Sequence, residues 1–145
     1  MSSYISEHLR HVVAIRANHL CEYCLIHGDD TFFGCEVDHI ISQKHGGLTE
    51  SDNLAYACFF CNRRKGSDIG SISNNGAFVR FFNPRQDRWR DHFRVERLFI
   101  RPISEIGEVT ARILDLNAND RILERRILAA AGRFPSASAL VHMSW

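Results

Sequence analysis

The spacing of hydrophobic and polar residues changes along the first half of the chain, and each change indicates a new element. Over residues 6–17, apolar side chains recur at helical spacing on one face, which predicts a short amphipathic helix with Ser6 as its N-cap. Residues 35–41 are mostly β-branched or alternate in polarity, so they predict a strand. Residues 54–59 predict a second strand, and a long polar loop joins the two. A helix is expected to follow from about Cys61.

The second half of the chain shows strand and helix patterns after a break. The break is residues 67–76, which are rich in Ser, Gly and Asn. The elements expected after it are strands at 78–82 and 94–100 and helices near 103–116 and 120–131. Asn119 is expected to cap the last helix, and the tail after Pro135 is expected to be loosely ordered. Together the patterns indicate an α+β protein with an N-terminal helix and a mostly helical C-terminal extension.

Length and composition are those of an ordinary globular protein. The chain has 145 residues, of which 45% are apolar and 24% are charged, as is usual for a soluble domain. No apolar run approaches the roughly 18 residues that a membrane span needs. The first residues lack a basic segment followed by an apolar one, so no secretory signal is apparent and a cytoplasmic location is expected.

Charge is unevenly distributed, although the net charge is only +1. Residues 1–59 hold 3 Lys or Arg against 8 Asp or Glu, whereas residues 60–101 hold 10 against 4. Residues 102–145 are balanced, with 5 of each kind. A basic middle third favours a phosphate-rich partner, but a solvated basic face would give the same counts.

Four of the five cysteines form two CxxC pairs, Cys21 with Cys24 and Cys58 with Cys61, which are separated by 33 residues. A CxxC turn brings two thiolates to one ion, and two such turns complete a tetrahedral zinc site. Because four cysteine ligands leave no position for water, we expect a structural zinc ion rather than a catalytic one. Chance motifs or redox dithiols are the alternatives, but a thioredoxin-like pattern is absent. Cys35 is expected to be a buried thiol.

Other polar residues gather around the predicted strands and suggest a second site. Asp38 and His39 can flank one site if the first strand ends or twists there. Carboxylate and amide oxygens suit Mg²⁺ or Mn²⁺, and a histidine beside such a site can take a proton from water at neutral pH. The following helix offers side chains that can hold phosphate oxygens, namely Arg63, Arg64 and Lys65. Metal-assisted hydrolysis of a phosphodiester needs these parts.

The joint order of these motifs resembles that of the HNH endonucleases, which have the ββα-metal fold. The matching pieces are CEYC, VDHIISQKHGG, DNL and CFFCNRRKG, and they run from residue 21 to residue 66. The resemblance implies an HNH core with the N-terminal helix and zinc knuckles over residues 1–68, and an extension packed on it over residues 69–145. It also implies hydrolysis of phosphodiester bonds in DNA, by nicking or by double-strand cleavage, with RNA not excluded.

The resemblance implies a role for each matching residue. His39 stands at the first histidine of the motif and would be the general base, and Asp38 would bind a catalytic Mg²⁺ or Mn²⁺ ion. Asn53 stands at the middle asparagine, whose amide braces the loop and orients the histidine. Asn62 takes the last position, where many members have histidine, and would be a second ligand of the ion. This departure leaves the metal preference open, because an imidazole would favour softer ions.

The stretch FFNPRQDRWRDHF at 81–93 mixes aromatic and basic residues. Its aromatic side chains are expected to pack over the core, while its arginines stay exposed and suit a nucleic-acid backbone. Arg85 and Arg88 are therefore expected to contact DNA together with the basic helix. A non-catalytic zinc module that binds nucleic acid or protein is the main alternative function, and a redox-sensing zinc protein is another. Neither alternative needs the pair Asp38 and His39.

Overall fold

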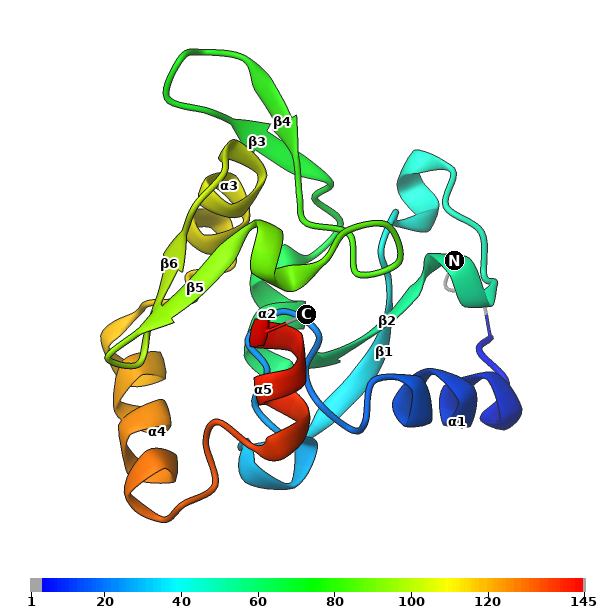
Figure 1. The fold of residues 1–145 in the computed structure, drawn as a ribbon. Coiled ribbons are helices and arrows are strands. Elements are labelled where there is room, and N and C mark those ends of the chain that lie inside the picture. The colour runs from blue at the N-terminus through cyan, green and yellow to red at the C-terminus, as the bar shows by residue number, and fades with distance from the viewer. Residues whose placement is uncertain (1–3, 145) are drawn as a thin grey trace.

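The first half of the chain is built on a β-hairpin that is followed directly by a helix. The structure is a computed structural model and describes residues 4–144. Strand β1 (Cys35–His39) pairs antiparallel with β2 (Leu54–Cys58), and α2 (Phe59–Lys65) follows β2 (Figure 1). Both strands lie where the sequence predicted them, although β1 ends two residues earlier than the predicted range.

The register of the hairpin separates two groups of polar residues. Cys58 lies opposite Cys35 at one end of the strand pair, and His39 lies opposite Leu54 at the other. Helix α2 begins two residues before the predicted start, because the Cys58 sulfur accepts a hydrogen bond from the backbone N–H of Cys61 at 3.4 Å and caps the helix. The cysteines therefore meet at the start of α2, while His39 lies at the far end of the hairpin.

Helix α1 (Glu7–Arg16) packs against this hairpin and begins as predicted. The Ser6 hydroxyl accepts a hydrogen bond from the backbone N–H of Leu9 at 3.1 Å, so the predicted N-cap is confirmed. The guanidinium of Arg16 donates to the backbone carbonyl of Leu54 at 2.9 Å. This bond fixes the end of α1 to the beginning of β2.

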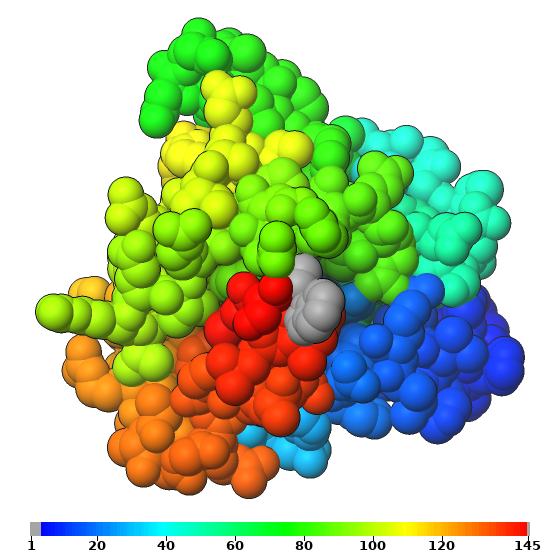
Figure 2. All heavy atoms as spheres, in the orientation of Figure 1, coloured from blue at the N-terminus to red at the C-terminus, as the bar shows by residue number. Residues whose placement is uncertain are grey.

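The extension consists of two further antiparallel hairpins and three helices within residues 69–144. The hairpin of β3 (Gly70–Ile72) and β4 (Phe78–Arg80) stands out from the body of the molecule (Figure 2). The other elements are β5 (Phe93–Glu96), β6 (Phe99–Pro102), α3 (Glu105–Ile113), α4 (Asn119–Ala130) and α5 (Ala137–Ser144). Among the residues that the structure describes, no helix is both long and apolar enough to cross a membrane.

Several details of the extension differ from the predictions. Residues 94–100 were predicted to have strand structure, and they include a turn at Arg97 and Leu98, whose φ values are 49° and 71°, between two paired strands. The predicted break contains strand β3. Asn119 is the first residue of α4 and does not cap it, because the N-cap position is Ala118. The tail that was predicted to be loose forms α5, which lies against β5.

One hydrophobic core includes residues from both halves of the chain. The aromatic side chains that were predicted to pack over the hairpin are all buried in it, namely Phe81, Phe82, Trp89 and Phe93. The indole N–H of Trp89 also donates to the backbone carbonyl of Tyr23 at 2.9 Å. Tyr23 lies between Cys21 and Cys24, so the extension packs directly on the first CxxC turn.

Candidate metal centre and active site

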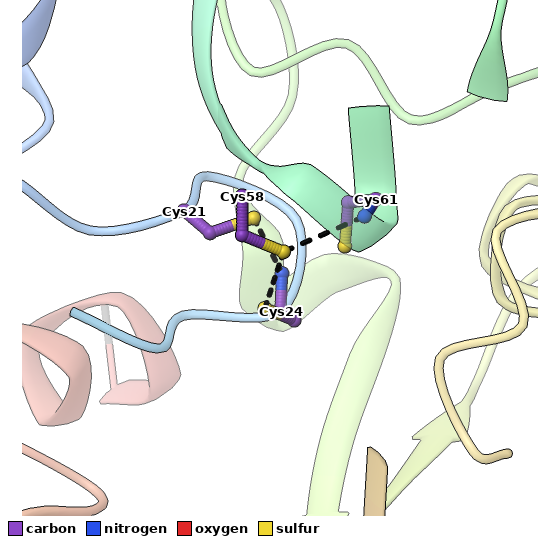
Figure 3. Close-up of side chains that lie close together, drawn as sticks. All are labelled: Cys21, Cys24, Cys58 and Cys61. Carbon is purple, nitrogen blue, oxygen red and sulfur yellow. Dashed lines mark hydrogen bonds between the residues drawn. The ribbon is translucent and has the colours of Figure 1, made fainter. Parts of the chain in front are cut away.

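The cysteines of the two CxxC pairs converge on one point. Cys21 and Cys24 lie in the turn after α1, Cys58 ends β2, and Cys61 lies in the first turn of α2 (Figure 3). Their sulfur atoms all lie within 4.8 Å of one another, and all four side chains are buried. The sulfurs of Cys24 and Cys58 are 3.8 Å apart. Tetrahedral Zn–S bonds of about 2.3 Å require sulfurs about 3.8 Å apart, so the donor set fits a zinc ion.

Backbone hydrogen bonds also favour thiolates in this cluster. The N–H of Cys24 donates to the Cys21 sulfur at 3.5 Å, and the N–H of Cys61 donates to the Cys58 sulfur at 3.4 Å. Hydrogen bonds among the cysteines lower the pKa of Cys58 and raise that of Cys61, and burial raises that of Cys21, so without a metal ion the negative charge is concentrated on one side of the cluster. Cys35 lies outside the cluster, half-buried, and burial raises the pKa of its thiol.

Arg121 of α4 is a partner of the cysteine cluster that the sequence did not indicate. Its guanidinium donates to the Cys24 sulfur at 3.0 Å and to the Cys58 sulfur at 3.5 Å, and Arg121 is only 5% exposed. Burial opposes its charge, but the nearby cysteine sulfurs raise the pKa of Arg121. Four thiolates around one Zn²⁺ ion carry two excess negative charges, and Arg121 offsets one of them. The guanidinium also stacks over the ring of Phe60 at 4.9 Å.

Asp38 lies at the other end of the hairpin and faces α2. The ammonium of Lys65 donates to Asp38 Oδ2 and to the backbone carbonyl of His39, both at 2.9 Å. The Lys65 side chain is only 1% exposed, because its ammonium pairs with Asp38 inside the protein. It therefore does not face solvent, contrary to the prediction that it contacts DNA. Burial raises the pKa of Asp38, and the positive charge of Lys65 works against that rise.

His39 is held by the hydroxyl group of Thr49, a residue that no motif in the sequence indicated. Its Nε2 atom lies 2.8 Å from Thr49 Oγ1, and the ring is half-buried. Thr49 belongs to the loop between β1 and β2. Its role depends on how this loop folds back over the end of β1, so no local pattern could reveal it.

Asn53 braces that loop through both atoms of its amide. Its Oδ1 accepts from the backbone N–H of Ile41, and its Nδ2 donates to the carbonyls of Ile41 and Leu48, all at 2.9 Å. Gly47 permits the close approach, because a Cβ atom there would lie 1.7 Å from the Ile41 carbonyl oxygen. The bond to the Leu48 carbonyl fixes the residue next to Thr49.

Asn62 lies on α2 one turn before Lys65. Residues three apart share a helix face, so Asn62 lies on the face from which Lys65 reaches Asp38. Its side chain is half-buried. Lys65 of α2 thus contacts β1 at Asp38 and His39, and Asn62 lies one turn earlier on the same helix.

The arginines that were predicted to bind DNA are placed in different ways. Arg63 is exposed, and its guanidinium lies 5.7 Å from the centre of the Phe59 ring. Arg64 and Arg88 are exposed as well, but each pairs with a carboxylate, that of Asp115 at 2.6 Å and that of Asp91 at 3.2 Å.

Arg85 is placed inside the protein, contrary to the prediction. Its side chain is 13% exposed and pairs with buried Glu22. The other carboxylate oxygen of Glu22 accepts from the backbone N–H of Tyr56 at 2.8 Å. A buried carboxylate needs such a cation, so Arg85 stabilises the packing of the extension against β2.

The fold and the cysteine cluster define a small α+β metal-binding domain. Residues 21–68 match the family model described as HNH endonuclease, which agrees with the resemblance seen in the sequence. No curated protein and no solved structure matches the chain. Residues 69–145 lie outside the family match, so the family says nothing of what the extension does.

Proposed function

We propose that this protein is a metal-dependent endonuclease that hydrolyses phosphodiester bonds in DNA, with His39 as the general base. The observation that carries the proposal is the pair Asp38 and His39 at the end of an HNH-type hairpin, beside the helix face that bears Asn62. A module that only bound zinc would not need a histidine held by a hydroxyl next to a carboxylate. RNA is a second possible substrate of the same chemistry.

His39 is arranged to accept a proton. When Nε2 carries the ring proton and donates it to Thr49, the lone pair of Nδ1 is free for a water molecule. A neutral imidazole can then take the proton of the attacking water near neutral pH. The Thr49 hydroxyl can accept that proton and so holds the ring, and Asn53 holds the loop that positions Thr49.

Asp38 and Asn62 are the proposed ligands of a Mg²⁺ or Mn²⁺ ion. Lys65 occupies Oδ2 of Asp38, and within residues 4–144 the other oxygen, Oδ1, has no hydrogen-bond partner. The amide oxygen of Asn62 comes from the same face of α2 as Lys65. Hard oxygen donors fit Mg²⁺ or Mn²⁺, and a bound ion of this kind would polarise the phosphodiester and stabilise its leaving oxygen.

Arg63 is the proposed main contact to phosphate, because its neighbour is an aromatic ring rather than an acid. Arg64 and Arg88 would add to this surface by exchanging their carboxylates for phosphates. The zinc ion is structural, and we place the enzyme in the cytoplasm, where thiols stay reduced. Residues 1–68 form the catalytic unit, and residues 69–145 form an extension that packs on it.

A nicking assay on supercoiled plasmid tests the proposal. Wild-type protein is expected to cut with Mg²⁺ or Mn²⁺ and not with EDTA. His39→Ala is expected to lose about 10²–10⁴-fold in rate, because a general base contributes that much, while its zinc content and fold stay intact. High Mn²⁺ should partly rescue Asp38→Ala but not His39→Ala, since added metal supplies no base. If His39→Ala cuts at the wild-type rate, a non-catalytic zinc module becomes the better account.

A further inference from the structure

A group of exposed aromatic rings lies at the start of α2. Phe32 and Phe33 are 71% and 70% exposed, although large apolar side chains are usually covered. Their rings meet edge to face with centroids 4.5 Å apart, and the ring of Phe33 lies 4.7 Å from that of Phe59. We call Phe32, Phe33, Phe59 and Arg63 the aromatic surface.

The backbone holds these rings outward at some cost. Phe33 has a φ of 70°, a left-handed conformation that bulky residues rarely adopt. Gly34 follows with a φ of 69°, and its carbonyl accepts from the backbone N–H of Phe59 at 3.2 Å. The loop is therefore tied to the start of α2 in a shape that displays Phe33 rather than buries it. Such unfavourable conformations are concentrated at functional sites.

Arg63 gives the aromatic surface a positive charge. Its guanidinium lies over the Phe59 ring, one turn along α2, and its side chain is exposed. Arginine stacked on an aromatic ring still has N–H groups for a phosphate oxygen. Within the described residues, no carboxylate pairs with Arg63, in contrast to Arg64 and Arg88.

The aromatic surface and the proposed active site share helix α2. Phe59 lies three residues before Asn62 on α2, which is about 4.5 Å along the helix axis, and six residues before Lys65, which is about 9 Å. Lys65 contacts Asp38, so along the α2 axis the aromatic surface and the residue that holds Asp38 are about three stacked nucleotides apart, at about 3.4 Å each.

We infer that the aromatic surface stacks the unpaired bases of the nucleic-acid strand that is being cut, so that single-stranded or locally unpaired DNA is the preferred substrate. The inference rests on the proposed nuclease function. Exposed aromatic rings with an adjacent arginine bind strands without regard to sequence, because every base has a flat face. In a duplex the bases are stacked on one another, so the rings could not reach their faces.

Binding of labelled oligonucleotides without added Mg²⁺ or Mn²⁺, where no cutting is expected and the zinc ion stays in place, tests this inference with the full chain. A 20-nucleotide single strand is expected to bind more tightly than the same sequence as a duplex. The double change Phe32→Ala with Phe33→Ala should weaken single-strand binding about ten-fold or more, the loss typical of one base–aromatic stack. Phe33→Trp should bind as well as wild type, whereas Phe33→Leu, which keeps apolar area but no ring, should bind weakly.

Phe99→Ala is the matched control, because Phe99 is an exposed phenylalanine on the β5–β6 hairpin, outside this surface. It should leave binding unchanged. Equal binding by wild type and the double variant, or by Phe33→Leu, would overturn the inference, as would a preference for intact duplex. Plasmid nicking by the wild type separates the two proposals. If the wild type cuts the plasmid but the phenylalanine changes do not affect binding, only the stacking role of the aromatic surface is wrong. If binding depends on the rings but no cutting occurs, only the proposed nuclease function is wrong.

Discussion

Helix α2 takes part in two polar sites that are completed in different ways. Near its start, Cys58 and Cys61 join two other cysteines in a buried cluster to which the chain supplies every ligand. Near its end, Lys65 holds Asp38, and the side chains of Asp38, His39 and Asn62 are only half-buried. We call the cysteine cluster the closed site and the group around Asp38 the open site. The closed site fixes α2, and α2 in turn positions the open site. Damage to the first should therefore destroy the second, whereas damage to the second should leave the first intact.

The largest expected effect is the loss of a zinc ligand. Cys58→Ser should release the zinc ion and unfold the ββα unit, because binding free energy in a small zinc site is largely folding free energy. Zinc content by elemental analysis and thermal unfolding measure this. Cys35→Ser is the matched control and should keep about one zinc ion per chain, since Cys35 lies outside the cluster. A folded, active Cys58→Ser protein would contradict the structural role of the site.

A smaller effect is expected when the partner of the thiolates is removed. Arg121→Met leaves two buried sulfurs without a charged donor, so zinc affinity should fall about 10–100-fold, as for other groups that support metal ligands. Competition with a chromogenic chelator measures this affinity. Arg126→Met removes an exposed arginine of the same helix and should change nothing. Equal affinities for the two variants would show that Arg121 only fills space.

The smallest effect is expected at the open site. Thr49→Val removes the hydrogen bond to His39 but keeps the shape of the side chain, so kcat should fall about ten-fold, the equivalent of one such bond, with KM little changed. Thr49→Ser keeps the hydroxyl and should retain most of the activity. Zinc content should be the same in both. A fall in kcat that is equal for Val and Ser would mean that Thr49 acts through packing and not through its hydrogen bond to His39.

The sequence revealed the parts of this molecule that depend on local pattern. The two CxxC turns, strands β1 and β2 and the Ser6 cap each follow from a few neighbouring residues. Lys65 and Arg85 were misplaced because a basic side chain looks the same in sequence whether it faces solvent or a buried carboxylate. The carboxylates that hold these side chains inside the protein are distant in sequence. Asp38 is 27 residues from Lys65, and Glu22 is 63 residues from Arg85.

Contacts made by distant segments account for the remaining omissions. Arg121 is 97 residues from Cys24, and nothing in its neighbourhood in the sequence points to sulfur. Thr49 is a single hydroxyl in a polar loop, and it matters only because Asn53 folds that loop back over β1. Helix α5 was predicted as a loose tail because its apolar segment is short and is stabilised by packing against β5, which the local sequence does not reveal.

The bond from Trp89 to Tyr23 gives the protein an optical reporter of its own. An indole that is 3% exposed and donates to the carbonyl between two zinc ligands emits from a dry, fixed environment. Opening of the first CxxC turn would bring water to that ring and move its fluorescence to longer wavelength. Trp145 is the only other tryptophan of the chain, so Trp145→Phe leaves one emitter. The state of the metal centre could then be followed in real time, without a dye, while the protein is mixed with nucleic acid.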